Sequence, residues 1–223
     1  MATSFVVNII TRFKSFNINN KSIKSKRNHP HQNMKEIIIR TMKNKSSAII
    51  ITGGPGMGKT SVLEQLSVMG YHSVEETGRS IIQKELKTDG NRLPWLDKEG
   101  FAMAMFKQSL KDFQNVSEKS GLTFFDRGIP DVIGYLKLCN ISIPETMWQA
   151  AKEKRYYPKV FITPPWKSIY VNDAERKQTF EEAVATYHIM KETYSFLGYE
   201  LVELPKTTVL KRAKFILNYL LTY

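Results

Sequence analysis

Cysteine is nearly absent from this sequence, which holds a single one, Cys139. One thiol cannot form an internal disulfide, and it also excludes a zinc site built from several cysteines. Long hydrophobic runs are missing too, because no stretch approaches the roughly 20 consecutive apolar residues of a membrane-spanning helix. We therefore predict a protein without membrane spans in a reducing compartment, most simply the cytoplasm.

Acidic residues are scarce in the first 45 positions, which hold only Glu36 against ten lysines and arginines. This segment carries +9 of the net charge of +12, which leaves only +3 for the rest of the chain. A nearly balanced body argues against specific nucleic-acid binding by the whole chain. We interpret residues 1–45 as a basic, mostly disordered leader and residues 46–223 as the folded domain.

The leader has several alternative roles. Its acid-poor, amphipathic start resembles an organelle-targeting peptide, although such peptides favour arginine over lysine. Basic residues near an anionic membrane contribute about 1 kcal/mol each, so a contact with such a membrane is another alternative. Met34 and Met42 are further potential start sites, and a start at either would leave most of the leader untranslated.

From Ser47 onward, short apolar runs alternate with segments of helical periodicity. The apolar runs predict five buried strands, which are Ala48–Thr52, His72–Glu75, Leu122–Phe125, Lys159–Thr163 and Glu200–Glu203. The periodic segments predict seven helices, which are Ser61–Met69, Gly78–Leu86, Asp97–Glu118, Asp131–Leu138, Pro144–Lys154, Phe180–Phe196 and Val209–Tyr219. The alternation predicts an α/β fold with a mainly parallel five-stranded sheet and helices on both faces.

One motif decides the class of protein. Residues 53–60 match the pattern G-x-x-x-x-G-K-[ST] at every position, and they lie between a predicted strand and a predicted helix. Backbone N–H groups of such a P-loop surround phosphate oxygens, the lysine reaches the β- and γ-phosphates, and the threonine hydroxyl ligates Mg²⁺. We therefore predict a P-loop NTPase that binds ATP or GTP with Mg²⁺. The predicted nucleotide-binding residues are Gly53, Gly54, Pro55, Gly56, Met57, Gly58, Lys59, Thr60 and Ser61.

The third predicted strand is followed by Asp126-Arg127-Gly128. This arrangement is typical of small-molecule kinases, with Asp126 near the metal and Arg127 directed at an anionic or hydroxylated substrate; a surface ion pair is the alternative. A G-protein would carry a late Asn/Thr-Lys-x-Asp motif and a hexameric AAA+ motor a strand ending in Asp-Glu, and neither is present. The D-x-x-G string that begins at Asp131 does not directly follow a strand, so we interpret it as incidental.

Two further segments supply candidate catalytic residues. Glu76 follows the second predicted strand, where a carboxylate can orient or deprotonate an attacking hydroxyl, while Glu75 is expected on the solvent side. Arg176 lies in a charged segment that could bring an arginine to the charge developing on a transferred phosphoryl group. The structural alternatives are acids that complement a helix dipole and a solvated helix start. Residues 205–208, after the last strand, are expected near the nucleotide base.

Several segments together resemble one known family. They are the P-loop, VEETGRSII at Val74–Ile82, FFDRGIPD at Phe124–Asp131, DAERK at Asp173–Lys177 and LGYELVELP at Leu197–Pro205. Over about residues 46–221 the chain is similar to the AAA-labelled P-loop domain family shared by ribosylnicotinamide-kinase-like and TRPL-translocation-defect proteins. The resemblance implies a nucleotide-kinase-like architecture, phosphate and Mg²⁺ roles for Lys59 and Thr60, and an Asp-Arg motif at Asp126 and Arg127. Animal members are also associated with GTP and phosphoinositide binding.

Two functions from different classes fit these residues. The leading one is a kinase for a nucleoside- or nucleotide-like small molecule, whose identity the residues do not reveal. Its predicted metal ligands are Thr60 and Asp126, and its predicted catalytic residues are Lys59, Asp126, Arg127, Glu76 and Arg176. The alternative is a nucleotide-dependent switch or slow NTPase whose leader contacts an anionic membrane or a partner.

Overall fold

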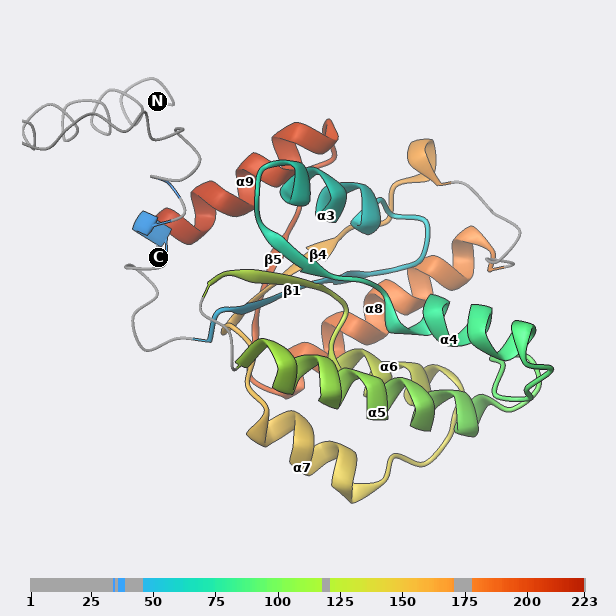
Figure 1. Cartoon of the computed structure of the whole chain (residues 1–223). Helices are drawn as coiled ribbons and strands as arrows, with labels where there is room; N and C mark the ends of the chain where they lie inside the picture. The colour runs from blue at the N-terminus through green and yellow to red at the C-terminus, as the bar shows by residue number, and fades with distance from the viewer. Residues whose placement is uncertain (1–33, 35, 39–45, 118–120, 171–177, 223) are drawn as a thin grey trace, which may run out of the picture.

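The computed structural model describes residues 34, 36–38, 46–117, 121–170 and 178–222. In this part of the chain, five parallel strands form one sheet in the order β2-β3-β1-β4-β5 (Figure 1). The strands are β1 (Ala48–Gly53), β2 (His72–Val74), β3 (Thr123–Asp126), β4 (Lys159–Thr163) and β5 (Glu200–Glu203). The predicted parallel α/β fold is confirmed, and each strand begins and ends within about one residue of its predicted bounds.

Helices cover both faces of the sheet, as predicted (Figure 1). One face is covered by α3 (Lys59–Val68) and α9 (Val209–Thr222). The other face is covered by α5 (Lys98–Ser117), α6 (Ile129–Leu138) and α8 (Phe180–Phe196), and α7 (Glu145–Glu153) packs against α6. The two remaining elements are α4 (Thr77–Lys87), which packs against α5, and the short 3-10 helix η1 (Lys167–Ile169), which follows β4.

The central strand β1 is buried on both sides. Ile49 and Ile51 belong to the apolar cluster under α3 and α9, whereas Ala48 and Ile50 belong to the cluster under α5, α6 and α8. Successive side chains of a strand point to opposite faces, so one short apolar run contributes to two cores. Packing from both sides therefore holds the end of β1, and the loop that follows it, in a defined position.

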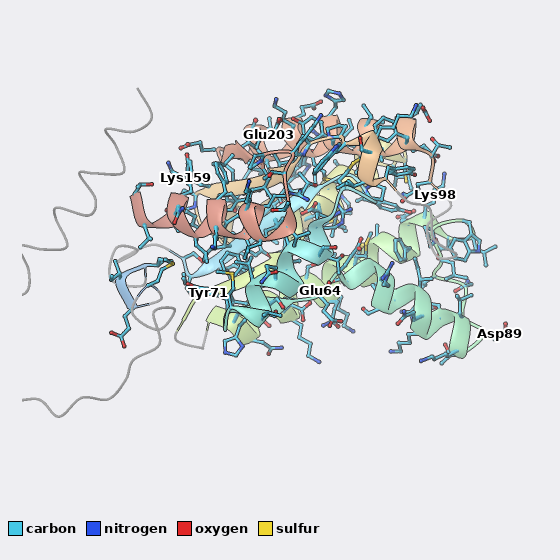
Figure 2. The ribbon with its side chains drawn as sticks, turned by 90° about the horizontal axis from the view of Figure 1, so that it is seen from above. Glu64, Tyr71, Asp89, Lys98, Lys159 and Glu203 are labelled. Carbon is cyan, nitrogen blue, oxygen red and sulfur yellow. The ribbon has the colours of Figure 1, made fainter. Side chains whose placement is uncertain are left out.

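The carboxyl ends of the strands form one edge of the sheet. At this edge the P-loop follows β1, Asp126 ends β3, and Glu76 lies between β2 and α4. The loop between α4 and α5 lies toward the same end of the molecule. Lys159 begins β4 and therefore marks the opposite, amino edge of the sheet, and Figure 2 shows the loop residue Asp89 at the other end of the molecule from Lys159. Ligands of doubly wound sheets bind outside this edge, where the strand order reverses. The candidate residues therefore lie where the fold binds ligands.

One residue of the predicted leader packs in the core. Ile38 is fully buried in the cluster under α3 and α9, and Met34 packs against the same cluster. Figure 1 shows this short segment beside the end of α9. Contact with the core therefore begins before residue 46, whereas the earlier part of the leader lies outside the described residues and its disorder stays a prediction.

Candidate active site

The P-loop joins the end of β1 to the start of α3. Gly58 has a left-handed backbone with a φ of 74°, which a residue without a Cβ adopts readily, and α3 begins at the next residue. The first N–H groups of that helix and its positive dipole end are directed at the loop. Lys59 is only 3% exposed, and its Nζ donates a hydrogen bond to the Gly54 carbonyl at 2.9 Å. The loop therefore has the backbone donors and the cation of a phosphate site.

Thr60, in the first turn of α3, lies beside Asp126 at the end of β3. The Thr60 hydroxyl donates a hydrogen bond to Asp126 Oδ2 at 3.3 Å. The second carboxylate oxygen, Oδ1, is buried and has no hydrogen-bond partner among the described residues. Burial raises the pKa of Asp126 to about 6, although the nearby Lys59 ammonium acts in the opposite direction.

This pair of residues fits Mg²⁺. Mg²⁺ takes oxygen ligands, usually one or two carboxylates together with phosphates and waters. Two protein groups here would be such ligands: the buried Asp126 Oδ1, which has no hydrogen-bond donor, and the neighbouring Thr60 hydroxyl. No group of three or more His, Cys, Asp or Glu side chains in the described residues could hold a metal by itself. Thr60 and Asp126 would therefore hold Mg²⁺ together with the phosphates of a nucleotide.

Arg127 lies in the turn after β3 and is held by two carboxylates. Its Nε donates to Glu76 Oε1 at 3.1 Å, and its Nη1 donates to Asp131 Oδ1 at 3.3 Å. Burial alone would lower the pKa of Arg127, but Glu76 and Asp131 raise it above its ordinary value. The Arg127 and Glu76 side chains are 17% and 21% exposed, so the pair is largely buried rather than on the surface.

The backbone of Arg127 is unusual as well. Its φ of 73° is uncommon for a residue with a side chain and costs about 1 kcal/mol or more. Its N–H donates to the Ile51 carbonyl at 3.1 Å, and the two carboxylates hold the guanidinium. These contacts keep Arg127 in the turn despite its backbone conformation, and they bring its side chain beside Glu76.

Glu76 and Glu75 differ in the way the sequence predicts. Glu75 is exposed to solvent, whereas Glu76 is partly buried and paired with Arg127. Glu76 also immediately precedes α4, so its carboxylate lies near the positive end of that helix. The catalytic role of Glu76 and its dipole-complementing role are therefore compatible, because one carboxylate can fill both.

Asp131 is a buried residue whose role the sequence analysis missed. Its Oδ1 accepts hydrogen bonds from Thr52 and Arg127, and its Oδ2 accepts from Tyr194 and from the Gly128 N–H. It thereby links β1, the turn after β3, and α8. The sequence analysis interpreted the D-x-x-G string as incidental, but the aspartate that begins it has this structural role. The signal for it was the position three residues after Gly128, at the start of a helix, where an acid can bond to the N-terminal backbone.

A hollow of about 640 Å³ opens beside the P-loop. Its wall is formed by P-loop residues including Gly58 and Ser61, by Trp166, and by residues 206–209 and 212. Residues 206–208 therefore line the same hollow as the P-loop, on the side where the sequence predicts the nucleotide base. The Trp166 N–H donates a hydrogen bond to Met57 Sδ at 3.3 Å, which joins the segment after β4 to the loop.

The nine predicted nucleotide-binding residues, 53–61, extend from the end of β1 into α3. Gly53 ends β1, and the other eight lie in the loop or in the first turn of α3. Arg176 lies outside the described residues. Within the described part of the chain, no helix is long and apolar enough to cross a membrane.

A comparison with known protein families assigns the chain to one of them. The family model for the AAA domain matches residues 48–212, which is most of the chain. The chain belongs to this family. No curated protein sequence matches the chain.

Solved structures resemble this AAA domain in fold. Shikimate kinase from Acinetobacter baumannii, in complex with shikimate, is 15% identical with a TM-score of 0.52, over 82% of this chain and 97% of that one. Thymidylate kinase from Candida albicans is 15% identical with a TM-score of 0.56, over 78% and 91%. The NadR protein in complex with NR is 18% identical with a TM-score of 0.55, over 81% of this chain but only 52% of that one.

These likenesses establish a nucleotide-kinase-like architecture for this AAA domain. The predicted resemblance is confirmed for the AAA domain family, and the NadR protein is a structural neighbour. The predicted link to TRPL-translocation-defect proteins stays a prediction.

Proposed function

We propose that the chain is a small-molecule kinase that transfers the γ-phosphoryl group of ATP to a hydroxyl of a nucleoside- or nucleotide-like acceptor. The observation that carries the proposal is the Glu76 carboxylate, which Arg127 holds at the carboxyl edge of the sheet. A carboxylate with an arginine beside it suits an acceptor that has a hydroxyl to deprotonate and polar groups to bind. The kinase-like fold supports the same reading.

On the nucleotide side, the chain's own groups bind and orient the triphosphate. The loop amides would surround the phosphates, and Lys59 would reach the β- and γ-phosphates. Thr60 and Asp126 would hold Mg²⁺, which neutralises charge on the transferred group when it is bound. We propose ATP as the donor, with GTP as the alternative.

On the acceptor side, Glu76 would take a proton. The acceptor's hydroxyl oxygen forms a bond to the γ-phosphorus, the bond from that phosphorus to the bridging oxygen breaks, and the nucleoside diphosphate leaves. The hydroxyl proton moves to Glu76, while Arg127 would bind the acceptor's polar groups or the transferred phosphoryl. Catalysis of this kind consists of positioning and electrostatic stabilisation.

The other roles proposed for the chain rest on the sequence. Arg176 would stabilise charge on the transferred group from a segment outside the described residues. The basic leader would contact an anionic membrane, which rests on its charge of +9. The cytoplasm is the proposed compartment, because a single cysteine suits a reducing environment.

A thermal-shift panel tests the kinase proposal. The full chain is heated with nucleosides, nucleotides and vitamins, each with and without a non-hydrolysable ATP or GTP analogue. A kinase is expected to gain stability from an acceptor, and to gain more when the analogue is also bound, because both ligands bind the folded state. Stabilisation by a nucleotide alone, with no acceptor effect, would instead favour the nucleotide-dependent switch or slow NTPase.

A further inference from the structure

A buried arginine from the last helix lies at the wall of the nucleotide hollow. Arg212 of α9 is 2% exposed and lines the hollow together with the P-loop. Its Nη2 donates a hydrogen bond to the Met57 carbonyl at 3.2 Å. Its Nε is buried without a hydrogen-bond partner, and no carboxylate among the described residues forms an ion pair with it.

The guanidinium of Arg212 keeps its charge in these surroundings. Burial lowers the pKa of Arg212, but an arginine is not deprotonated in a protein. A buried cation is unfavourable unless an anion or several acceptors replace its lost hydration. The Met57 carbonyl replaces only part of it. The arrangement therefore fits a site whose remaining partner is an anion.

The Arg212 guanidinium lies beside the last glycine of the P-loop. Its Nη1 is 2.8 Å from the position that a Cβ on Gly58 would occupy, and Gly58 is the last glycine of the loop. In this motif the loop amides surround the α- and β-phosphates, whereas the lysine reaches the β- and γ-phosphates. The hollow beside Arg212 continues to Lys206 and Trp166. The anion that Arg212 faces is therefore the part of the nucleotide nearest to its sugar and base.

We propose that Arg212 is a second cationic ligand of the bound nucleotide, acting on the α- and β-phosphates while Lys59 acts on the β- and γ-phosphates. The C-terminal helix α9 thereby completes the nucleotide site. This inference rests on the proposed nucleotide binding and adds a ligand that the P-loop motif does not contain. ADP retains the phosphates that face Arg212 and lacks the γ-phosphate, so the two cations differ in the ligands they favour.

Calorimetric titration of the full chain with ADP and with a non-hydrolysable ATP analogue tests the role of Arg212. The variant Arg212→Met is expected to weaken both ligands by a similar factor, about tenfold or more, because both keep the α- and β-phosphates. The nucleotide-free variant should melt at the wild-type temperature or above, because the change removes a buried, unpaired charge. Lys211→Met is the matched control: Lys211 is the exposed neighbour on α9, and both affinities should stay within about twofold of wild type.

A purely structural role for Arg212 predicts a different pattern. Arg212→Gln can still donate to the Met57 carbonyl but loses the charge, whereas Arg212→Lys keeps the charge. The proposal predicts that the Lys variant binds ADP more tightly than the Gln variant. This comparison tests whether the charge of Arg212 binds the nucleotide, even if the Met variant fails to fold. A Gln variant that binds ADP as tightly as wild type, or as tightly as the Lys variant, would overturn the proposal.

The wild-type titration separates this inference from the function on which it rests. A wild-type chain that binds neither ADP nor the ATP analogue would contradict nucleotide binding itself. Tight binding by wild type that Arg212→Met leaves undiminished would contradict only the role of Arg212.

Discussion

The two halves of the carboxyl edge carry opposite charge. The P-loop half, residues 53–61 with Arg212, presents two buried cations and a series of backbone N–H groups. The carboxylate half has one arginine, Arg127, among three acids, which are Glu76, Asp126 and Asp131. Each half is largely buried, so its charges act on each other and on a ligand with little screening by solvent.

The difference shows how one edge can handle two kinds of ligand. An excess of buried cations favours the phosphates of a nucleotide. An excess of buried carboxylates favours a metal ion and can accept a proton. Thr60 and Asp126 join the two halves through their hydrogen bond of 3.3 Å. Substitutions in the P-loop half should therefore reduce binding, and substitutions in the carboxylate half should reduce turnover.

The largest effect is expected from Asp126→Asn. The amide keeps the size of the side chain but loses the charge that would hold Mg²⁺, so Mg²⁺-dependent phosphate release or transfer should fall on the order of a thousandfold. The melting temperature near neutral pH should be unchanged or higher, because the raised pKa of Asp126 shows that its buried charge is unfavourable. Steady-state turnover and a melting curve check both points. Full activity in the Asn variant would leave Asp126 a structural residue.

Lys59→Ala should reduce nucleotide binding by the P-loop half. Removing this cation is expected to weaken ATP binding about a hundredfold or more, because the charge-assisted contact to the β- and γ-phosphates is lost. ADP should lose less, since it has no γ-phosphate. Calorimetry measures both affinities, and a circular dichroism spectrum checks that the fold is intact. An affinity for ATP within about threefold of wild type would contradict the P-loop assignment.

Glu76→Gln should lower turnover while sparing nucleotide affinity. The amide cannot accept a proton and holds Arg127 less firmly, so kcat should fall about tenfold to a hundredfold. Glu75→Gln is the matched control, because Glu75 is exposed and adjacent in sequence. Kinetics of the two variants with one acceptor give the comparison. If the two variants lose activity equally, Glu76 is not the residue that handles the acceptor.

Lowering the pH should have a smaller effect on stability and on Mg²⁺-dependent nucleotide binding, through protonation of Asp126 in the carboxylate half. The pKa of Asp126, about 6 in the folded chain, lies above its ordinary value of 3.8. As the pH falls through about 6, the folded chain takes up the proton first, so the fold gains stability while Mg²⁺-dependent nucleotide binding weakens. Melting and binding curves from about pH 7.5 to pH 5 measure both trends. The Asp126→Asn variant is the control, and it should lack the part of each trend that Asp126 contributes.

The smallest effect on the site is expected from deletions far from both halves. Deleting residues 1–33 should leave nucleotide binding and the melting temperature nearly unchanged. Deleting residues 1–40 also removes Ile38, whose buried side chain contributes about 2–4 kcal/mol, so the melting temperature should fall by roughly 5–15 °C. Differential scanning calorimetry compares the two deletions. Equal melting temperatures would mean that Ile38 adds nothing to the core.

Much of the fold and part of the site follow from local sequence patterns. The β-branched run at 48–52, the glycines after it and the helical periodicity beyond are neighbours in sequence, so they predict the P-loop and its elements. Asp126 and Glu76 follow apolar strands directly, which predicts that both lie at the carboxyl edge. These residues could be found because each lies next to the element that positions it.

The residues that sequence analysis missed act over long sequence distances. Arg212 contacts the P-loop at Met57 across 155 residues, and Asp131 accepts its hydrogen bond from Tyr194 across 63. Neither of these long-range contacts leaves a pattern in a short window of sequence, because tertiary packing brings the partners together. Only the contact of Asp131 with the Gly128 N–H has a local signal. Ile38 was assigned to the leader for the same reason: its place in the core depends on α9, near the other end of the chain.

The most direct test of the kinase proposal follows the γ-phosphoryl group of labelled ATP. The wild-type chain is incubated with Mg²⁺, ATP labelled at the γ-position and each acceptor that stabilises it in the thermal-shift panel. We predict that the label appears on one acceptor, in equal amount to the ADP formed, and that Asp126→Asn nearly abolishes the transfer. Label that appears only as inorganic phosphate, at a rate no acceptor changes, would contradict the kinase proposal and support a nucleotide-dependent switch or slow NTPase.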